Sequence, residues 1–115
     1  MLMGMVQECK VSEDASDSEL SMLIQKKAPT TKEGKCLFSC IMEQMDVLED
    51  GKLNKNGFMD LASTMSGGET KFMKLAEAIF TECALLNDDD RCELGVKIGA
   101  CIKIGGMKRK IDFGI

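Results

Sequence analysis

This chain of 115 residues lacks histidine, tryptophan and tyrosine, and it contains a single proline. Without histidine it has no side chain whose ordinary pKa lies between pH 5 and 8, and no evident base for a nucleophile. We therefore expect a protein that is not an enzyme and has no catalytic residues. A proton switch between pH 7 and 5 is not expected either, because the remaining candidates, such as Asp112, titrate near pH 4.

Excess positive charge and long apolar runs are also missing. The formal net charge is −4 and the pI is near 4.9, which argues against a nucleic-acid partner. No apolar run approaches the roughly 20 residues that cross a bilayer, so membrane insertion is not expected. The segment from Met1 to Met5 is too short for a secretory signal peptide and lacks a basic start, so we expect that such a peptide has been removed.

Cysteine, by contrast, is plentiful, with six residues at Cys9, Cys36, Cys40, Cys83, Cys92 and Cys101. A zinc site needs ligands in close pairs, and only one short pair is present, so we expect no metal and no cofactor. An even cysteine count in a small chain favours three disulfides, which persist in secreted, extracellular proteins. Fifteen pairings are conceivable, and the spacing alone does not choose among them.

Apolar residues recur at intervals of three and four, which predicts one all-α domain over residues 1–115 with six helices. A short first helix carries the first cysteine. A capping box that begins at Ser16 opens the second helix, and Pro29 is expected to end it. Thr30 or Thr31 caps a third helix that runs to about Leu48.

The second half of the chain continues the same pattern. Asp50-Gly51 breaks the chain, and a fourth helix runs from about Asn54 until Ser66-Gly67-Gly68. Glu69 opens a fifth helix, and three aspartates, 88–90, begin a sixth that runs toward Gly105-Gly106. The last five residues alternate, so they could lie extended with one apolar side against the body or fray as a free terminus.

The order Cys-x26-Cys-x3-Cys-x42-Cys-x8-Cys-x8-Cys, set on six expected helices, resembles the insect odorant-binding proteins, the pheromone and general odorant-binding family. The resemblance covers nearly the whole chain. It implies the disulfides Cys9–Cys40, Cys36–Cys92 and Cys83–Cys101, in a six-helix bundle that encloses an apolar cavity. It also implies a carrier that takes odorants, pheromones or similar semiochemicals through aqueous lymph toward receptors, with a membrane receptor as a further candidate partner.

The same resemblance places pocket positions on Phe38, Met42, Phe80 and Ile102. Apolar faces of the fourth to sixth helices and the tail extend this set, and methionine suits a wall that adapts to several ligands. Without the resemblance these stripes would be interpreted as ordinary core. Ser39, Ser63, Thr64 and Thr81 could bond a polar ligand group, although helical hydroxyls usually bond their own turn. The predicted ligand-binding residues are Phe38, Met42, Phe58, Ala62, Met65, Phe72, Ala76, Ile79, Phe80, Ile98, Ile102 and Phe113.

Two alternatives stay open at this point. The first is a non-olfactory carrier of the same fold for a hormone or lipid. The second is a secreted interaction or defence protein with a solid core, in which the methionines only fill space. In each case we expect a monomer or a weak homodimer.

Overall fold

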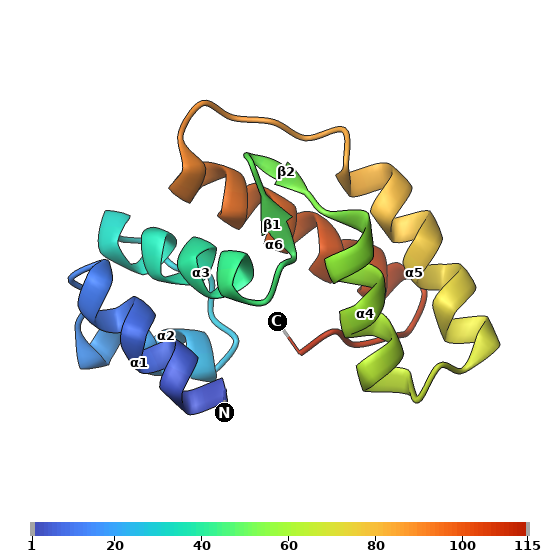
Figure 1. Ribbon diagram of the computed structural model, residues 1–115, viewed down its shortest axis with the longest axis horizontal. Coiled ribbons are helices and arrows are strands. Elements are labelled where there is room, and N and C mark those ends of the chain that lie inside the picture. Colours follow the sequence, from blue (N-terminus) through green and yellow to red (C-terminus); the bar gives the residue numbers. More distant parts are fainter. Residues whose placement is uncertain (1, 115) are drawn as a thin grey trace.

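Six helices and one short β-hairpin make up residues 2–114, the part of the chain that the computed structural model describes (Figure 1). The all-α prediction with six helices is confirmed. In chain order the elements are α1 (Leu2–Ser12), α2 (Asp17–Ile24), α3 (Lys32–Gln44), β1 (Leu48–Glu49), β2 (Lys52–Leu53), α4 (Lys55–Ser66), α5 (Thr70–Cys83) and α6 (Arg91–Lys108).

Capping side chains set where the helices begin. The Ser16 hydroxyl accepts the N–H of Glu19 at 3.2 Å, and the Glu19 carboxylate accepts the N–H of Ser16 at 2.8 Å, so the expected capping box is present. Thr31, rather than its neighbour, caps α3 by accepting the N–H of Gly34 at 3.0 Å. Asp90 caps α6 in the same way.

Two helices end earlier than the sequence predicted. α2 ends at Ile24 and not at Pro29, because Lys26 turns the chain with a φ of 61°. α3 ends at Gln44 instead of near Leu48, and Asp46 follows it with a φ of 60°. Both turns place a non-glycine residue in the left-handed region, which single-residue propensities do not signal.

Leu48, the expected end of the third helix, begins a β-hairpin instead. β1 and β2 pair antiparallel, with Leu48 opposite Leu53. Asp50 and Gly51 join them with φ values of 52° and 72°, which suits a two-residue turn with two left-handed positions. The Asp-Gly pair, which predicts a chain break, is also a short-range hairpin signal.

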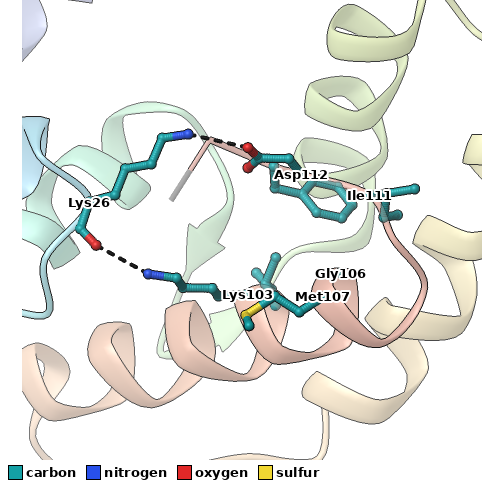
Figure 2. A pocket seen from close by; sticks show the side chains of 8 residues that line it. Lys26, Lys103, Gly106, Met107, Ile111 and Asp112 are labelled. Carbon is teal, nitrogen blue, oxygen red and sulfur yellow. Dashed lines mark hydrogen bonds and ion pairs between the residues drawn. The ribbon is translucent and has the colours of Figure 1, made fainter.

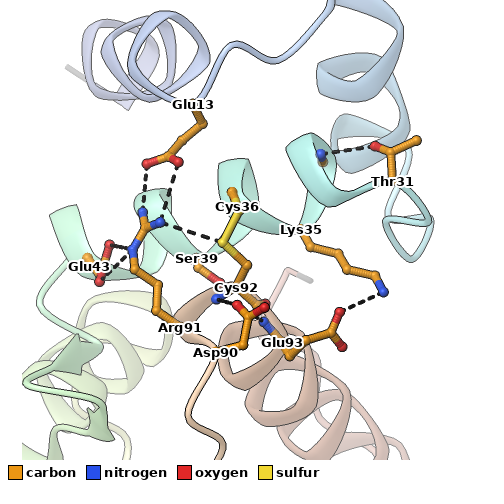
Figure 3. Close-up of a disulfide and its surroundings, with 11 residues drawn as sticks. Glu13, Thr31, Lys35, Cys36, Ser39, Glu43, Asp90, Arg91, Cys92 and Glu93 are labelled. Atoms are coloured by element: carbon orange, nitrogen blue, oxygen red, sulfur yellow. Dashed lines mark hydrogen bonds and ion pairs between the residues drawn. A yellow bond between two sulfur atoms is a disulfide. The ribbon is translucent and has the colours of Figure 1, made fainter.

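Glycines on α6 let α3 cross it at close range. A Cβ on Gly95 would overlap the Oγ of Ser39, and a Cβ on Gly99 would lie 2.5 Å from the Phe38 ring. The buried Ser39 hydroxyl donates to the carbonyl of Cys92 at 3.1 Å (Figure 3). Because these glycines have no side chain, α3 and α6 can pack in close contact, and the other elements are arranged around this pair.

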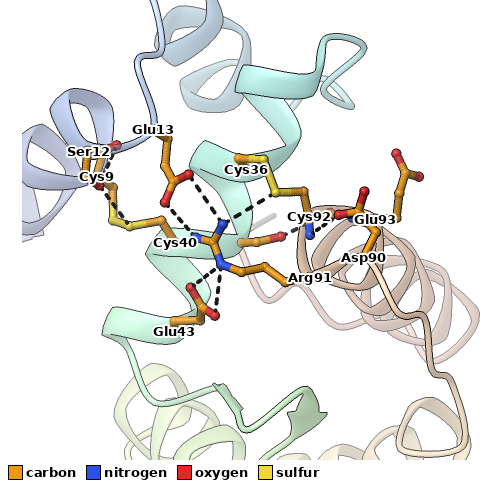
Figure 4. A network of polar contacts seen from close by, with 11 residues as sticks. Cys9, Ser12, Glu13, Cys36, Cys40, Glu43, Asp90, Arg91, Cys92 and Glu93 are labelled. Carbon is orange, nitrogen blue, oxygen red and sulfur yellow. Dashed lines mark hydrogen bonds and ion pairs between the residues drawn. A yellow bond between two sulfur atoms is a disulfide. The ribbon is translucent and has the colours of Figure 1, made fainter.

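The three disulfides join the elements as the resemblance implied. Cys9–Cys40 ties α1 to α3 and Cys36–Cys92 ties α3 to α6 (Figure 4). Cys83–Cys101 ties α5 to α6. They close separations of 31, 56 and 18 residues, worth roughly 3 to 4 kcal/mol each in the chain-entropy account. α4 and the tail after α6 contain no cysteine and stay outside this covalent frame.

Arg91 adds a polar clamp next to two of these bridges. Its Nε donates to Glu43 at 3.0 Å, and its Nη2 lies 2.6 Å from Glu13, so one guanidinium joins the segment after α1 to α3 and α6 (Figure 4). The pKa of Arg91 is raised, first by the hydrogen bond to Glu13 and also by Glu43. Lys35 and Glu93 make a second α3–α6 ion pair at 2.8 Å.

Two apolar clusters fill the bundle. The smaller cluster lies between α1, α2 and α3 and includes Leu20 and Leu37 with the Cys9–Cys40 bridge. The larger one lies between α3, the hairpin, α4, α5 and α6, and its fully buried side chains include Phe58, Ile79 and Ile98. The candidate site belongs to this larger cluster.

Candidate functional site

The chain's own tail occupies the middle of the larger apolar cluster. The Phe113 side chain is only 6% exposed. Its ring stacks on Phe58 of α4 with 5.2 Å between centroids, and it lies 5.4 Å from Phe72 of α5 at a tilt of 52°. Phe80 completes the aromatic group at 6.4 Å from Phe58. A residue just before the chain end thus packs where helices α4 and α5 face each other.

A tight reversal after α6 directs the tail back into the bundle. Lys110 adopts a φ of 58°, and the N–H of Ile111 donates to the carbonyl of Gly106 at 2.9 Å. This six-to-one bond is that of a Schellman motif. A Cβ on Gly106 would lie 2.7 Å from the Ile111 carbonyl oxygen, so only glycine allows the tail this close.

A pocket of about 230 Å³ lies beside the tail, between the end of α2 and α6 (Figure 2). Its interior side is apolar, with Ile102 and Phe113, and its rim carries the cations of Lys26 and Lys103. The full lining is Lys26, Ile102, Lys103, Gly106, Met107, Ile111, Asp112 and Phe113.

Charged groups at this rim contact the tail. Lys26 Nζ lies 3.2 Å from the Asp112 carboxylate, and Lys103 Nζ donates to the carbonyl of Lys26 at 3.1 Å. The pKa of Asp112 lies below its ordinary value because the N–H of Gly114 donates to the carboxylate, and because Lys26 and then Lys103 stabilise its negative charge. The ion pair is exposed, so its contribution to stability is small.

A second, more open hollow of about 480 Å³ lies by the α4–α5 connection and the start of the tail. Ile111 borders both hollows. The lining of this second hollow is Ser66, Glu69, Lys71, Phe72, Leu75, Arg109, Lys110 and Ile111.

The structure brings the predicted ligand-binding residues together, with one exception. Met65 is 40% exposed and lies outside the large cluster. All the others belong to that cluster or pack against it: Phe38, Met42, Phe58, Ala62, Phe72, Ala76, Ile79, Phe80, Ile98, Ile102 and Phe113. The grouping shows one continuous apolar interior, and whether it takes a ligand stays a prediction.

Two of the four hydroxyls considered as ligand partners already have protein partners. Ser39 donates to the Cys92 carbonyl, and Thr81 donates to the Glu77 carbonyl one turn earlier on its own helix at 3.1 Å. A polar ligand group would have to compete with these bonds. Ser63 and Thr64 are partly and largely exposed, respectively.

Sequence reasoning missed the rim of the pocket. Lys26, Lys103 and Met107 are exposed residues at the end of α2 and on α6, and no apolar periodicity marks them. Ile111, by contrast, belongs to the tail whose apolar side the sequence analysis placed against the body as one alternative. Tertiary folding alone brings the end of α2 beside the last turns of α6.

No helix within residues 2–114 combines the length and hydropathy needed to cross a bilayer.

Known proteins resemble the chain in sequence. The model of the PBP/GOBP family matches residues 1–104. General odorant-binding protein 28a of Drosophila melanogaster is 30% identical over 104 residues, covering 89% of this chain and 73% of that protein. General odorant-binding protein 19d of the same fly is 29% identical over 97 residues, covering 83% and 65%.

Solved structures resemble it too. The odorant-binding protein dmelOBP28a from Drosophila melanogaster superposes with a TM-score of 0.83 at 28% identity, covering 96% of this chain and 93% of its own. The fatty acid binding protein OBP56a from the oral disk of the blowfly Phormia regina gives 0.79 at 25% identity, covering 93% and 90%. Odorant Binding Protein 7 from Anopheles gambiae gives 0.71 at 18% identity, covering 98% and 88%, which supports the fold alone.

Proposed function

The chain belongs to the PBP/GOBP family, a family of small-ligand carriers rather than enzymes, and from that membership we propose a specific role. It is a secreted carrier that reversibly binds odorants, pheromones or similar semiochemicals in its apolar interior. It transports them through aqueous lymph toward a membrane receptor.

The position of Phe113 is the observation that carries this proposal. Its ring fills the space between Phe58 and Phe72, yet the tail is outside the disulfide frame and borders two hollows. An apolar ligand can take the place of this ring without breaking a covalent tie. α4, which supplies Phe58, is also free of disulfides and can shift with the ligand.

The expected affinity suits a carrier. A ligand of about 15 heavy atoms at roughly 0.5 kcal/mol per atom gains about 7 to 8 kcal/mol. This corresponds to a dissociation constant in the micromolar range. Such binding is tight enough to hold a volatile compound in water and weak enough to release it.

Three disulfides involving all six cysteines support the proposed extracellular location, because such bonds persist outside the reducing cytosol.

Displacement of a fluorescent apolar probe, N-phenyl-1-naphthylamine, tests the proposal. The oxidised protein at micromolar concentration is expected to bind the probe and to release it when aliphatic alcohols, esters or aromatics are added. Reduced and alkylated protein serves as the control and is expected to lose binding, because the frame around the interior is released. Failure of every such probe to enter the oxidised protein would contradict the carrier role.

A non-olfactory carrier of a hormone or lipid remains the second candidate. The blowfly neighbour is named as a fatty acid binding protein, which favours lipid transport as the alternative task. Expression outside sensory tissue would support this alternative. A solid-core interaction or defence protein is the third candidate, and it predicts no probe binding at all. Sedimentation at increasing concentration tests the proposed monomer or weak homodimer.

A further inference from the structure

The pocket beside the tail has two chemically different ends. Its inner end is apolar, formed by Ile102 of α6 and the Phe113 ring. Its outer end carries two ammonium groups, Lys26 after α2 and Lys103 on α6 (Figure 2). A molecule that fills it has to be apolar at one end, and it is favoured when it is negatively charged at the other.

The tail itself matches this description. Asp112 places a carboxylate 3.2 Å from Lys26 Nζ, and the next residue places its aromatic ring among Phe58 and Phe72. Two consecutive residues thus present an anion to the cationic rim and an apolar group to the interior at the same time. Lys103 also acts on this carboxylate, since its charge contributes to the lowered pKa of Asp112 after the Gly114 hydrogen bond and Lys26.

The two lysines are held in a defined relationship by backbone contacts. Lys103 Nζ donates to the Lys26 carbonyl at 3.1 Å, and the N–H of Lys26 donates to the carbonyl of Leu23 at 2.9 Å. Within residues 2–114, no carboxylate lies within ion-pair distance of Lys103. The rim therefore presents one cation that forms an ion pair with the tail and one that forms no ion pair with a described residue.

We propose that the site selects ligands with an apolar body and a carboxylate head, the head binding at Lys26 and Lys103 and the body replacing Phe113. The tail acts as an internal stand-in for such a ligand and leaves when the ligand binds. This inference rests on the carrier function proposed above and specifies the chemical class of its cargo.

The preference is expected to be moderate. Lys26 is half exposed, and an exposed lysine attracts a carboxylate as a screened point charge. Near pH 7 an aliphatic carboxylic acid is ionised, whereas the alcohol of the same chain length is neutral. We expect the acid to bind about three- to tenfold more tightly than the alcohol at low salt.

The test compares decanoic acid with decan-1-ol as competitors of N-phenyl-1-naphthylamine near pH 7, below the concentration at which the acid aggregates. The Lys26→Gln/Lys103→Gln variant is expected to lose the preference for the acid, so that the ratio of the two competitor affinities falls to about one. The control is Lys32→Gln/Lys74→Gln, which removes the same charge from two exposed positions outside the pocket and is expected to keep the preference.

The outcomes separate this inference from the function on which it rests. Equal affinity for acid and alcohol in the unsubstituted protein overturns the inference while the carrier role stands. A preference that survives the Lys26/Lys103 variant, or is lost in the control as well, also overturns it. Failure of both competitors and the probe to bind contradicts the carrier role itself.

Discussion

The ring of Phe113 stacks on the ring of Phe58 with 5.2 Å between their centroids and 29° between their planes. One residue belongs to α4 and the other to the tail after the last helix, so the contact joins two segments that no disulfide holds. The centre of the apolar interior is therefore closed by two segments that lie outside the disulfide frame.

Replacing Phe113 with alanine is expected to weaken the fold and to improve ligand binding. Loss of the buried ring lowers the free energy of unfolding by about 3 kcal/mol. Because the ring no longer competes for the interior, the affinity for N-phenyl-1-naphthylamine rises by roughly three- to tenfold. Chemical denaturation and probe titration measure the two effects. Ile104→Ala, an exposed apolar position on α6, is the control and changes neither.

Enlarging a side chain next to the aromatic group is expected to weaken binding. A Phe80→Trp variant places additional volume beside Phe58, so the space available to a ligand shrinks and the probe affinity falls by roughly tenfold. Leu85→Trp adds a similar ring at a position that is 81% exposed and leaves the affinity unchanged. Unchanged affinity in Phe80→Trp would remove this residue from the site.

The crossing of α3 and α6 is expected to be intolerant of a single methyl group. Gly95→Ala brings a Cβ into overlap with Ser39 and strains its bond to the Cys92 carbonyl, which destabilises the fold by about 1 to 3 kcal/mol. Gly4→Ala in α1 meets no atom within 4 Å, and it is expected to stabilise by up to about 1 kcal/mol because alanine favours a helix. Thermal unfolding of the pair measures the difference; similar shifts in both would refute the close crossing.

The disulfides are expected to rank by the length of chain they close. Removing Cys36–Cys92 by paired serine substitution costs roughly 4 kcal/mol, and removing Cys83–Cys101 costs roughly 3 kcal/mol, since their separations are 56 and 18 residues. Urea unfolding of the two variants tests this order. The reverse order would mean that local packing outweighs loop entropy.

The contacts that the Asp112 carboxylate makes in the tail are expected to be insensitive to pH between 7 and 5. The pKa of Asp112 is lowered below 3.8 in the folded protein, so the stability from its contacts is complete above the unfolded pKa and is lost as the pH falls through the folded pKa. The change thus lies below about pH 4. An NMR titration of the Asp112 carboxyl measures it, with Asp112→Asn as the reference. A midpoint between pH 5 and 7 would contradict this placement.

Much of the local structure could be read from single residues. Ser16 with Glu19 marked a helix start correctly, because a capping box depends only on residues three apart. The ends of the helices were harder to predict from the sequence. Lys26 and Lys110 end α2 and α6 with positive φ values, and nothing in their residue type indicates this.

At Gly105 and Gly106 the sequence predicted a helix end that the structure does not have. They were expected to end the sixth helix, yet α6 continues through them to Lys108. A Cβ on Gly105 would lie 3.1 Å from Ile79, and one on Gly106 would lie 2.7 Å from the Ile111 carbonyl. Packing between segments outweighed the low helix propensity of glycine at these positions.

The candidate site likewise has one part that the sequence predicted and one part that it did not. Its apolar wall was visible as periodic stripes, and all predicted residues except Met65 joined one cluster. Its charged rim was not visible, because Lys26 and Lys103 are distant in sequence and exposed, and exposed lysines occur throughout the chain.

By itself, the order of residues determined the helices, their caps and, through the spacing of six cysteines, the family resemblance that implied the disulfide pairing. These features depend on neighbours along the chain or on a pattern that spans all of it. Only the tertiary structure decided that Phe113 closes the interior. It also decided that Lys26 and Lys103 lie side by side at the rim of the pocket. The physical reason is that both depend on which surfaces approach in space, and that approach is set by the glycines of α6 and the turn at Lys110.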